Sequence, residues 1–344
     1  MIIKKIKLEN YTVFDNLQIE FSPGINILIG ENGTGKTHIL KVLYSACQSV
    51  SKKISFTHKL VSTMLPDDYK LSRLITRKQG RDNGSIRIVA GETDVSAERI
   101  LTASFSKKTK RWDGTVTGED GWEESFAGVS SVFIPAKEIL SNSYNLNAAV
   151  EKDNVRFDDT YLDIINAAKI DISVSRNNST KDVMLETIER ITHGTVVYDS
   201  NRDEFYLRSG NSKHEFNLVA EGIRKMALLW QLVKNGTLEK GSVLFWDEPE
   251  ANINPAYIST IVEILLALEK KGVQIFISTH DYMLASYFAV KKTAESRIIF
   301  HSFYRKNDDA GIMYKSYERF SDISNNPIIN AFDKLLNDIY DINL

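Results

Sequence analysis

Residues 30–37 of this chain, GENGTGKT, combine residue types and spacing that suit the binding of phosphate groups. They fit the pattern G-x-x-x-x-G-K-[ST] and lie between an apolar run at residues 25–29 and a segment with helical spacing. Glycine at three positions lets the backbone fold into a ring whose N–H groups point at phosphate oxygens. We therefore predict a nucleotide-binding phosphate loop made by Gly30, Glu31, Asn32, Gly33, Thr34, Gly35, Lys36 and Thr37.

Two side chains at the end of this phosphate loop have predicted roles of their own. Lys36 is expected to reach the β- and γ-phosphates, where its charge would also serve catalysis. Thr37 is expected to place its hydroxyl on Mg²⁺, and the positive end of the following helix would strengthen phosphate binding. The motif therefore predicts ATP and Mg²⁺ as cofactors, with a chance glycine-rich turn as the alternative.

A second segment with chemical potential is GSVLFWDEPEANINP, residues 241–255. Its apolar run, residues 243–246, reads as a strand that ends in Asp247 and Glu248. Open α/β sheets bind ligands at the carboxyl ends of their parallel strands. We predict that Asp247 helps to hold Mg²⁺, through water, and that Glu248 polarises the attacking water. An exposed acidic turn is the alternative.

A third strand-like run, residues 273–277 in GVQIFISTHDYML, ends in Ser278, Thr279 and His280. A histidine at a strand end is usually an ordinary surface or core residue. Because this one follows a strand of the same predicted sheet, we predict that His280 senses the γ-phosphate and stabilises charge in the transition state.

Residues 217–225, NLVAEGIRK, lie between the phosphate loop and the acidic strand and run into an apolar, helix-like segment. This order of segments resembles the head of ABC-type ATPases, in which a signature sequence precedes the acidic strand. The resemblance covers residues 1–48, 131–138 and 217–303, and includes the opening KIKLENYTVFDNLQIEF and the acidic strand with its D-loop, DEPEANINP.

The loop ENGTGKT is more similar to that of SMC, RecF and OLD-type proteins than to that of transporter subunits. The group that the chain resembles most is the bacterial OLD-like, AAA-type ATPases. These proteins are often found in phage-defence operons beside a separate effector.

The resemblance implies that a second copy of the chain completes each site, in a head-to-tail homodimer. The signature segment would contact the γ-phosphate of the nucleotide held by the other protomer. The residues carried over to nucleotide binding in this way are Ala220, Glu221, Gly222, Arg224, Lys225 and the D-loop residue Asn252. A plain helix start remains the alternative for residues 220–225.

One departure from the family pattern lies in the signature itself. Ala220 stands where a serine is usual, so one hydroxyl contact to the γ-phosphate is lost. The backbone at Glu221 and Gly222 and the positive end of the following helix can still bind an anion.

A second departure concerns the Q-loop, which supplies a metal ligand in the family. Residues 130–140, SSVFIPAKEIL, read as the right strand and exit, but they offer Lys137 and Glu138 in place of a glutamine. Gln48 and Gln79 are poorly placed, so the second ligand of the metal is open.

The predicted fold class is α/β, a P-loop NTPase of ABC-ATPase type with a mixed core sheet, an antiparallel β lobe and a helical lobe. We expect a single head over residues 1–344. Its predicted parts are a nucleotide-binding core (1–50, 131–140 and 217–303), an inserted β-rich lobe (52–130), a helical lobe with a hairpin (141–216) and a C-terminal strand and helix (304–344).

Two features of the C-terminal part carry further expectations. Asp308 and Asp309 read as a hairpin turn between two strands. The final segment places six apolar residues on one helical face, predicted to pack on the head, with docking of a second protein as the alternative. These residues are Ile328, Ile329, Phe332, Leu335, Leu336 and Ile339.

Composition narrows the class of protein. The chain has 344 residues, of which 42% are hydrophobic and 26% are charged, with a net charge of −2, so no overall field draws it to nucleic acid or to a membrane. We expect no signal peptide, no membrane span and a cytoplasmic location. A single cysteine, Cys47, rules out a disulfide framework and a Cys-rich zinc site. Basic clusters at residues 70–81 and 107–111 fit either nucleic-acid or partner binding or solvated turns.

These observations lead to two hypotheses about function. The first is an ATP-binding and hydrolysing, Mg-dependent switch that dimerises around ATP and regulates a separate effector, a toxin or nuclease, in anti-phage defence. The second is a DNA-repair or recombination ATPase clamp that acts directly on DNA. Between residues 36 and 222 there are no sustained heptads, which argues against a long coiled-coil arm. The residues after His280 are too few for an appended nuclease domain of the OLD type, so we expect none in this chain.

Overall fold

The computed structural model describes residues 1–50, 54–93, 95, 97–152, 155–171, 183–305, 311–324 and 326–340. Within these residues the largest sheet has six strands in the order β14-β13-β3-β12-β11-β7. The strands are β3 (Ile25–Gly30), β7 (Ser131–Ile134), β11 (Val243–Asp247), β12 (Gln274–Thr279), β13 (Ile298–Arg305) and β14 (Ile312–Tyr317). Neighbouring strands are parallel, except that β13 and β14 are antiparallel, so this core sheet is mixed as predicted.

The three strands at the centre of the core sheet are buried along their whole length. Their sequences, INILIG, VLFWD and QIFIST, are runs of large apolar residues with little alternation, because helices cover both faces of the sheet. One face packs on α1 (Lys36–Gln48). The other packs on α5 (Asp159–Ala168), α7 (Glu221–Lys234), α8 (Ile258–Lys270) and α9 (Tyr282–Lys291).

A five-stranded antiparallel sheet, counted over the described residues, has the order β2-β1-β4-β5-β6. Its strands are β1 (Ile2–Tyr11), β2 (Phe14–Glu20), β4 (Asn83–Gly91), β5 (Arg99–Ser106) and β6 (Thr115–Thr117). Since β1 pairs with β4, this sheet combines strands from residues 1–50 with strands from residues 52–130. Helices α2 (Phe56–Met64) and α3 (Glu119–Phe126) complete this lobe.

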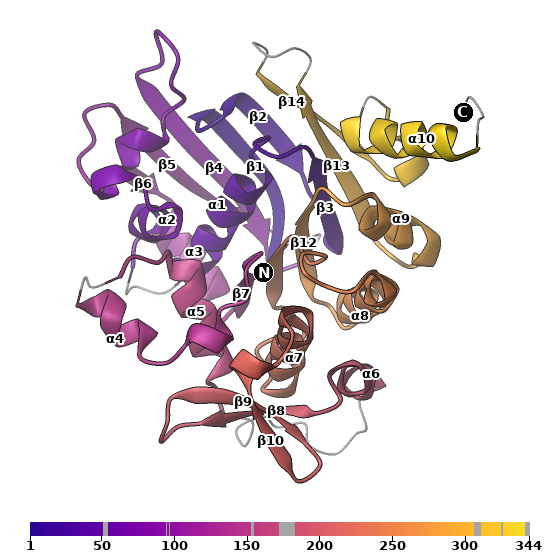
Figure 1. Ribbon diagram of the computed structural model, residues 1–344. Coiled ribbons are helices and arrows are strands. Elements are labelled where there is room, and N and C mark those ends of the chain that lie inside the picture. The colour runs from indigo at the N-terminus through magenta and orange to yellow at the C-terminus, as the bar shows by residue number, and fades with distance from the viewer. Residues whose placement is uncertain are drawn as a thin grey trace.

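Helix α1 lies between the antiparallel sheet and the core sheet (Figure 1). Its apolar residues, such as Leu40 and Leu43, share one buried cluster with Ile6 of β1 and Phe245 of β11. The helix that begins at the phosphate loop is therefore part of the packing of both sheets.

The segment between β7 and α7 in the chain forms the helical lobe. It contains α4 (Leu146–Glu151), α5, α6 (Val183–Thr192) and the antiparallel strands β8 (Thr195–Asp199), β9 (Glu204–Ser209) and β10 (Ser212–Glu215). These strands lie at the bottom of Figure 1, next to the start of α7. Short 3₁₀ turns link the elements: η1 (Asp67–Tyr69), η2 (Leu71–Leu74), η3 (Leu140–Asn142), η5 (Phe216–Leu218), η6 (Pro255–Tyr257) and η7 (Phe320–Asp322).

Polar contacts tie the helical lobe to the helix of the phosphate loop. The Nζ atom of Lys41 on α1 donates to Asp158 Oδ2 at 2.8 Å, and the Tyr44 hydroxyl donates to Asp163 Oδ2 at 2.7 Å. Lys59 of α2, which is 5% exposed, also contacts Asp163, at 2.7 Å. A movement of α1 would therefore displace the start of α5 through these contacts.

The C-terminal part ends in α10 (Pro327–Tyr340), which projects to the right in Figure 1. The ring of Phe332 stacks on Tyr282 of α9, with 3.9 Å between the centroids, while Leu335 and Ile339 are 51% and 60% exposed. The predicted apolar face is thus only partly packed on the head. The predicted hairpin turn at Asp308 and Asp309 lies outside the described residues. Among the described residues, no helix combines the length and apolar character that a membrane span requires.

Candidate functional site

The phosphate loop connects the end of β3 to the start of α1. Gly33 and Gly35 have φ angles of +77° and +88°, in the left-handed region that favours glycine. A Cβ atom on Gly35 would lie 2.5 Å from the ring of Phe14 and 2.7 Å from Val13 Cγ2. The loop therefore needs glycine at position 35 both for its backbone angle and for its close approach to the β1–β2 turn.

Lys36 is buried at the first position of α1. Its Nζ atom donates to Gly30 O at 2.5 Å and to Glu31 O at 2.9 Å, which places the ammonium inside the loop. Burial lowers the pKa of Lys36, while the carboxylates of Glu248 and Asp247 act in the opposite direction. A partly desolvated ammonium attracts phosphate charge more strongly than one in open water.

Asp247 lies at the end of β11, directly beside the start of α1. Thr37 Oγ1 donates to its two carboxylate oxygens at 3.0 and 3.1 Å, and Ser278 Oγ donates to its Oδ1. Burial raises the pKa of Asp247, and the hydrogen bonds from Ser278 and Thr37 oppose that rise. The parallel pairing of Asp247 with Ser278 brings these groups to the same level of the sheet.

The Thr37 hydroxyl and the Asp247 carboxylate are hard oxygen donors that suit Mg²⁺. Among the described residues, no three His, Cys, Asp or Glu side chains gather into a metal-binding group. A cation held here would thus rely on these two residues together with water and phosphate oxygens, which is the usual manner of binding for Mg²⁺.

The two other predicted catalytic residues, Glu248 and His280, are in contact. Glu248 Oε1 lies 3.0 Å from His280 Nδ1, and the two side chains are 30% and 43% exposed. Glu248 has a φ angle of +48°, and its backbone N–H donates to Ser278 O at 3.0 Å. A non-glycine residue in the left-handed region is strained, and such strain is concentrated at functional sites.

The signature segment forms the first turn of α7. Ala220 is the exposed N-cap residue and makes no side-chain capping hydrogen bond, and Glu221 is the first helical residue. A Cβ atom on Gly222 would lie 2.6 Å from Asn252 O and 3.1 Å from Ile253 Cα. The start of α7 is thus packed directly on the D-loop, where Asn252 is exposed and has a φ angle of +61°.

Arg224 is held by contacts within its own chain. Its Nε atom donates to Glu138 Oε2 at 2.6 Å, and the Glu138 side chain is fully buried in this pair. Its Nη1 atom donates to Val219 O at 2.6 Å. The charge that we predicted to face a partner's nucleotide therefore neutralises a buried carboxylate instead.

Lys225 also differs from the expectation. The residue is 0% exposed, and its Nζ atom donates to Ala251 O in the D-loop at 2.7 Å. Burial lowers its pKa, against the opposing effect of Glu221. Ala220 is consequently the exposed residue of the segment, while Glu221 and Gly222 are half-buried.

The Q-loop position stays without a glutamine. Lys137 is exposed and Glu138 pairs with Arg224. Gln48 donates from its Nε2 atom to Ser131 O at 3.1 Å, at the far end of α1, and Gln79 lies in an exposed turn.

Three side chains at the site had no role in the sequence analysis. Ser278 contacts Asp247, as described above. Arg305, exposed at the end of β13, donates from Nη2 to Gly33 O at 3.3 Å. Glu250 Oε1 accepts a hydrogen bond from Thr279 Oγ1 at 2.6 Å, whereas its Oε2 atom is buried without a partner among the described residues. Only the order of the strands, which the sequence does not show, brings Arg305 to the phosphate loop.

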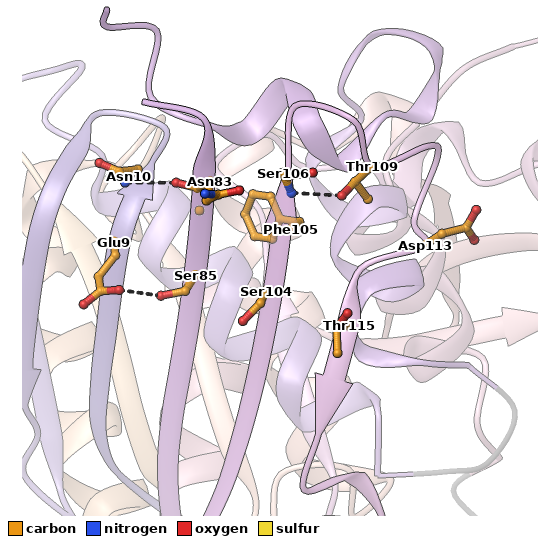
Figure 2. A pocket seen from close by; sticks show the side chains of 11 residues that line it. Glu9, Asn10, Asn83, Ser85, Ser104, Phe105, Ser106, Thr109, Asp113 and Thr115 are labelled. Atoms are coloured by element: carbon orange, nitrogen blue, oxygen red, sulfur yellow. Dashed lines mark hydrogen bonds between the residues drawn. The ribbon is translucent and has the colours of Figure 1, made fainter. Parts of the chain in front are cut away.

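A separate polar cavity of about 400 Å³ lies on the antiparallel sheet, and none of the phosphate-loop residues lines it (Figure 2). Two hydrogen bonds join groups of its lining: Asn10 Nδ2 donates to Asn83 O at 2.9 Å, and Ser85 Oγ donates to Glu9 Oε2 at 2.9 Å. Asn10 Oδ1 is buried without a partner among the described residues.

The first basic cluster is largely paired with nearby acids, as in the ion pair of Lys78 Nζ with Asp15 Oδ2 at 2.6 Å. These contacts favour solvated turns for that cluster. In the second cluster, Lys107 Nζ lies 2.7 Å from Asp82 Oδ1 and Arg111 lies over the ring of Trp112, which stacks on His58 with 4.1 Å between centroids.

Residues 25–286 match the sequence profile of a family described as "AAA domain, putative AbiEii toxin, Type IV TA system". The chain belongs to this family. The matched range of the AAA domain includes the phosphate loop, the signature segment, Asp247, Glu248 and His280.

Curated relatives of this AAA domain include the DNA replication and repair protein RecF of Limosilactobacillus fermentum, which is 36% identical over 109 residues. This match covers 31% of the chain and 28% of the relative. RecF of Lachnoclostridium phytofermentans is 39% identical over 61 residues, or 18% of the chain and 17% of the relative. The chain thus spans less than a third of the length of these relatives.

Solved structures show the fold. A structure of the SMC head bound to the C-winged helix domain of ScpA superimposes with a TM-score of 0.61 at 14% identity, covering 94% of this chain and all of that one. The SMC head domain from Thermotoga maritima gives a TM-score of 0.51 at 14% identity, covering 91% and 98% of the two chains. The predicted fold class is confirmed: the AAA domain is an SMC-head-like P-loop ATPase of α/β type.

The protonation of Glu250 should make folding stability depend on pH. Burial raises the pKa of Glu250 to about 7 from its ordinary value of 4.5, with Asp281 adding to the rise and His280 opposing it. Between these two pKa values the folded state holds a proton that the unfolded state releases. The contribution of Glu250 to the free energy of unfolding is therefore fully present below pH 4.5 and is lost as the pH rises through 7. Compared with Glu250→Gln, the wild type should lose on the order of 2 to 3 kcal/mol between pH 4.5 and pH 8.

Urea denaturation at several pH values measures this loss. As a control, Glu295→Gln changes a carboxyl whose side chain is 81% exposed and should follow the wild type throughout. A difference between wild type and Glu250→Gln that does not change with pH would show that Glu250 titrates normally.

Proposed function

We propose that this AAA-domain protein is a Mg-dependent ATP phosphohydrolase that pairs head-to-tail with a second copy around ATP and thereby regulates a separate effector. The observation that carries the proposal is the convergence of five predicted residues at one edge of the core sheet. They come from three segments of the chain and are Lys36, Thr37, Asp247, Glu248 and His280.

Nucleotide binding would use the groups that surround the phosphate loop. The loop N–H groups and Lys36 would bind the β- and γ-phosphates, and the start of α1 would add its positive dipole end. Thr37 and Asp247 would hold Mg²⁺, which when bound neutralises charge on the phosphate oxygens. Arg305, beside Gly33, would contribute further positive charge.

Hydrolysis would rest on the contact between Glu248 and His280. Glu248 would orient a water and accept its proton while the water oxygen attacks the γ-phosphorus and the bond to the ADP oxygen breaks. His280, held 3.0 Å from Glu248, would donate a hydrogen bond to the γ-phosphate oxygens. Both side chains are partly exposed, which gives a water access to the carboxylate.

The second copy would contribute residues 220–222 together with Asn252. Behind the exposed N-cap residue Ala220, the first turn of α7 is half-buried and carries backbone N–H groups that no N-cap side chain accepts from, so a γ-phosphate is a suitable acceptor for them. Arg224 and Lys225 are left out of this contact because both are engaged within the chain.

The family description links the AAA domain to a type IV TA system and applies the words "putative AbiEii toxin" to the family itself. The separate effector, a toxin or nuclease acting in the cytoplasm in phage defence, is proposed from the resemblance to OLD-like ATPases. ATP-dependent closing and opening of the dimer would then be the signal that the effector receives.

Two substitutions with different expected effects on ATP binding test the catalytic assignment. Glu248→Gln should bind ATP, stop hydrolysis and accumulate a dimer, because the water is no longer activated while the phosphate contacts remain. Lys36→Ala should lose ATP binding, since it removes the buried cation of the loop. Phosphate release and light scattering with ATP measure both. Wild-type turnover by Glu248→Gln would refute the role of this carboxylate.

A single glycine tests the pairing of two copies. Gly222→Asp should block ATP-driven dimerisation, because any side chain meets Asn252 O at 2.6 Å and a carboxylate would repel the phosphate. ATP binding by the monomer should stay within about threefold of wild type, since the phosphate loop is unchanged. Gly121→Asp in α3 is the matched control, because this glycine is also helical, has no positive φ, and a Cβ there comes no closer than 3.9 Å, to Arg99 Cδ. Dimerisation that survives Gly222→Asp would leave the segment as a plain helix start.

A DNA-binding clamp is the second candidate, favoured by the sequence similarity to RecF, which is named as a DNA replication and repair protein. It predicts DNA binding that weakens steeply as salt increases and that is reduced when the cations at residues 107–111 are replaced by alanine. Fluorescence anisotropy with duplex DNA, with and without ATP, measures this. Absence of binding at low salt would leave the effector switch as the remaining proposal.

A further inference from the structure

The D-loop, residues 249–254, is attached to two other elements of the site through neighbouring residues. Thr279 Oγ1, at the end of β12, donates to Glu250 Oε1 at 2.6 Å. Lys225 Nζ, in the first turns of α7, donates to the next carbonyl, Ala251 O, at 2.7 Å. The loop therefore connects the strand that leads into His280 with the helix that begins at residues 220–222.

The attachment at β12 is close to the γ-phosphate side of the site. Thr279 directly precedes His280, and its Oγ1 atom also accepts a hydrogen bond from Asp281 N at 2.9 Å. One hydroxyl thus links Glu250 to the backbone on the far side of His280. A movement of the backbone at His280 would therefore act on these two hydrogen bonds.

The attachment at α7 is formed by a side chain that packing alone does not explain. The following residues, MALLWQL, are buried, and an apolar residue at position 225 would suit this environment. Lys225 instead places an ammonium where it is 0% exposed, and Glu250 Oε2 is buried without a partner among the described residues. Buried polar groups of this kind are costly and are found where function requires them.

The close approach of Gly222 to the D-loop completes the connection. Because the backbone of Asn252 lies against the position of a missing side chain, the loop and the first turn of α7 fit without a gap. Displacement of the loop would then press directly on residues 220–222.

We infer that Glu250 and Lys225 are positioning residues that pass the state of the γ-phosphate site, through the D-loop, to the first turn of α7 in the same chain. The inference rests on the proposed function at one point, the contact of His280 with the γ-phosphate of a nucleotide bound to the same chain. The consequence for a second copy also assumes that residues 220–222 meet the partner's nucleotide, whereas the step from His280 to α7 takes place within one chain.

Two substitutions remove the two links one at a time in the full-length chain, and two further substitutions keep the Thr279–Glu250 link as controls. Thr279→Val removes the hydroxyl with little change of shape, and Thr279→Ser keeps it. Lys225→Met removes the ammonium and keeps the length of the side chain. Glu250→Gln keeps the acceptor oxygen for Thr279 and serves as the conservative variant.

The first measurement is amide hydrogen exchange with and without ATP, at protein concentrations where the chain is monomeric. In the wild type, in Thr279→Ser and in Glu250→Gln, ATP should change the exchange of residues 220–226. In Thr279→Val and Lys225→Met this response should be lost, while ATP affinity stays within about threefold of wild type. An unchanged response in both variants would overturn the inference.

The second measurement is ATP-driven dimerisation, followed by analytical ultracentrifugation. Thr279→Val and Lys225→Met should weaken it by about tenfold or more, as expected for the loss of a coupling between sites. A wild type that never dimerises would refute the proposed function, yet the exchange response of the monomer would still decide the inference. Thermal unfolding of each variant identifies any that fails to fold. If Lys225→Met does not fold, Thr279→Val alone decides the inference.

Discussion

The carboxylate of Asp247 is the point at which the distant parts of the site are joined. It accepts hydrogen bonds from Thr37, 210 residues earlier in the chain, and from Ser278, 31 residues later. These bonds form only because β11 lies beside β12, and β12 beside β3, in parallel register, so that three strand ends reach the same edge. A slip of one residue between these strands would turn each side chain to the opposite face and separate the groups.

Structure could be predicted from the sequence where it depends on residues within one short segment. The apolar runs of β3, β11 and β12 and the glycine pattern of the phosphate loop are local features, so the core strands could be predicted from them. The fold class came from the resemblance of the order of these segments to ABC-type ATPase heads. The fates of Arg224 and Lys225 did not follow, because their partners are the carboxylate of Glu138 and the carbonyl of Ala251. A charged residue early in a helix looks the same in sequence whether it faces solvent or a loop that arrives 26 residues later.

The position of Arg305 likewise could not be predicted from the sequence. β13 could have followed β12 at any position in the sheet, and only its pairing of Phe303 with Gly30 takes Arg305 past the strand end to the phosphate loop. Outside the core, α10 leaves the apolar side chains of Leu335 and Ile339 more than half exposed, whereas the central core strands are buried. The family match ends at residue 286, so this half-exposed face lies outside the matched range.

The burial of α1 between the two sheets has a consequence for the lifetime of the protein. The helix that begins at the phosphate loop contributes to both the antiparallel lobe and the core, so a ligand on that loop stabilises the folded chain as a whole. A nucleotide at a hundred times its dissociation constant adds about 2.7 kcal/mol to folding stability. On the proposed function, removal of the nucleotide would take away this contribution, and both lobes would become easier to unfold and to cleave.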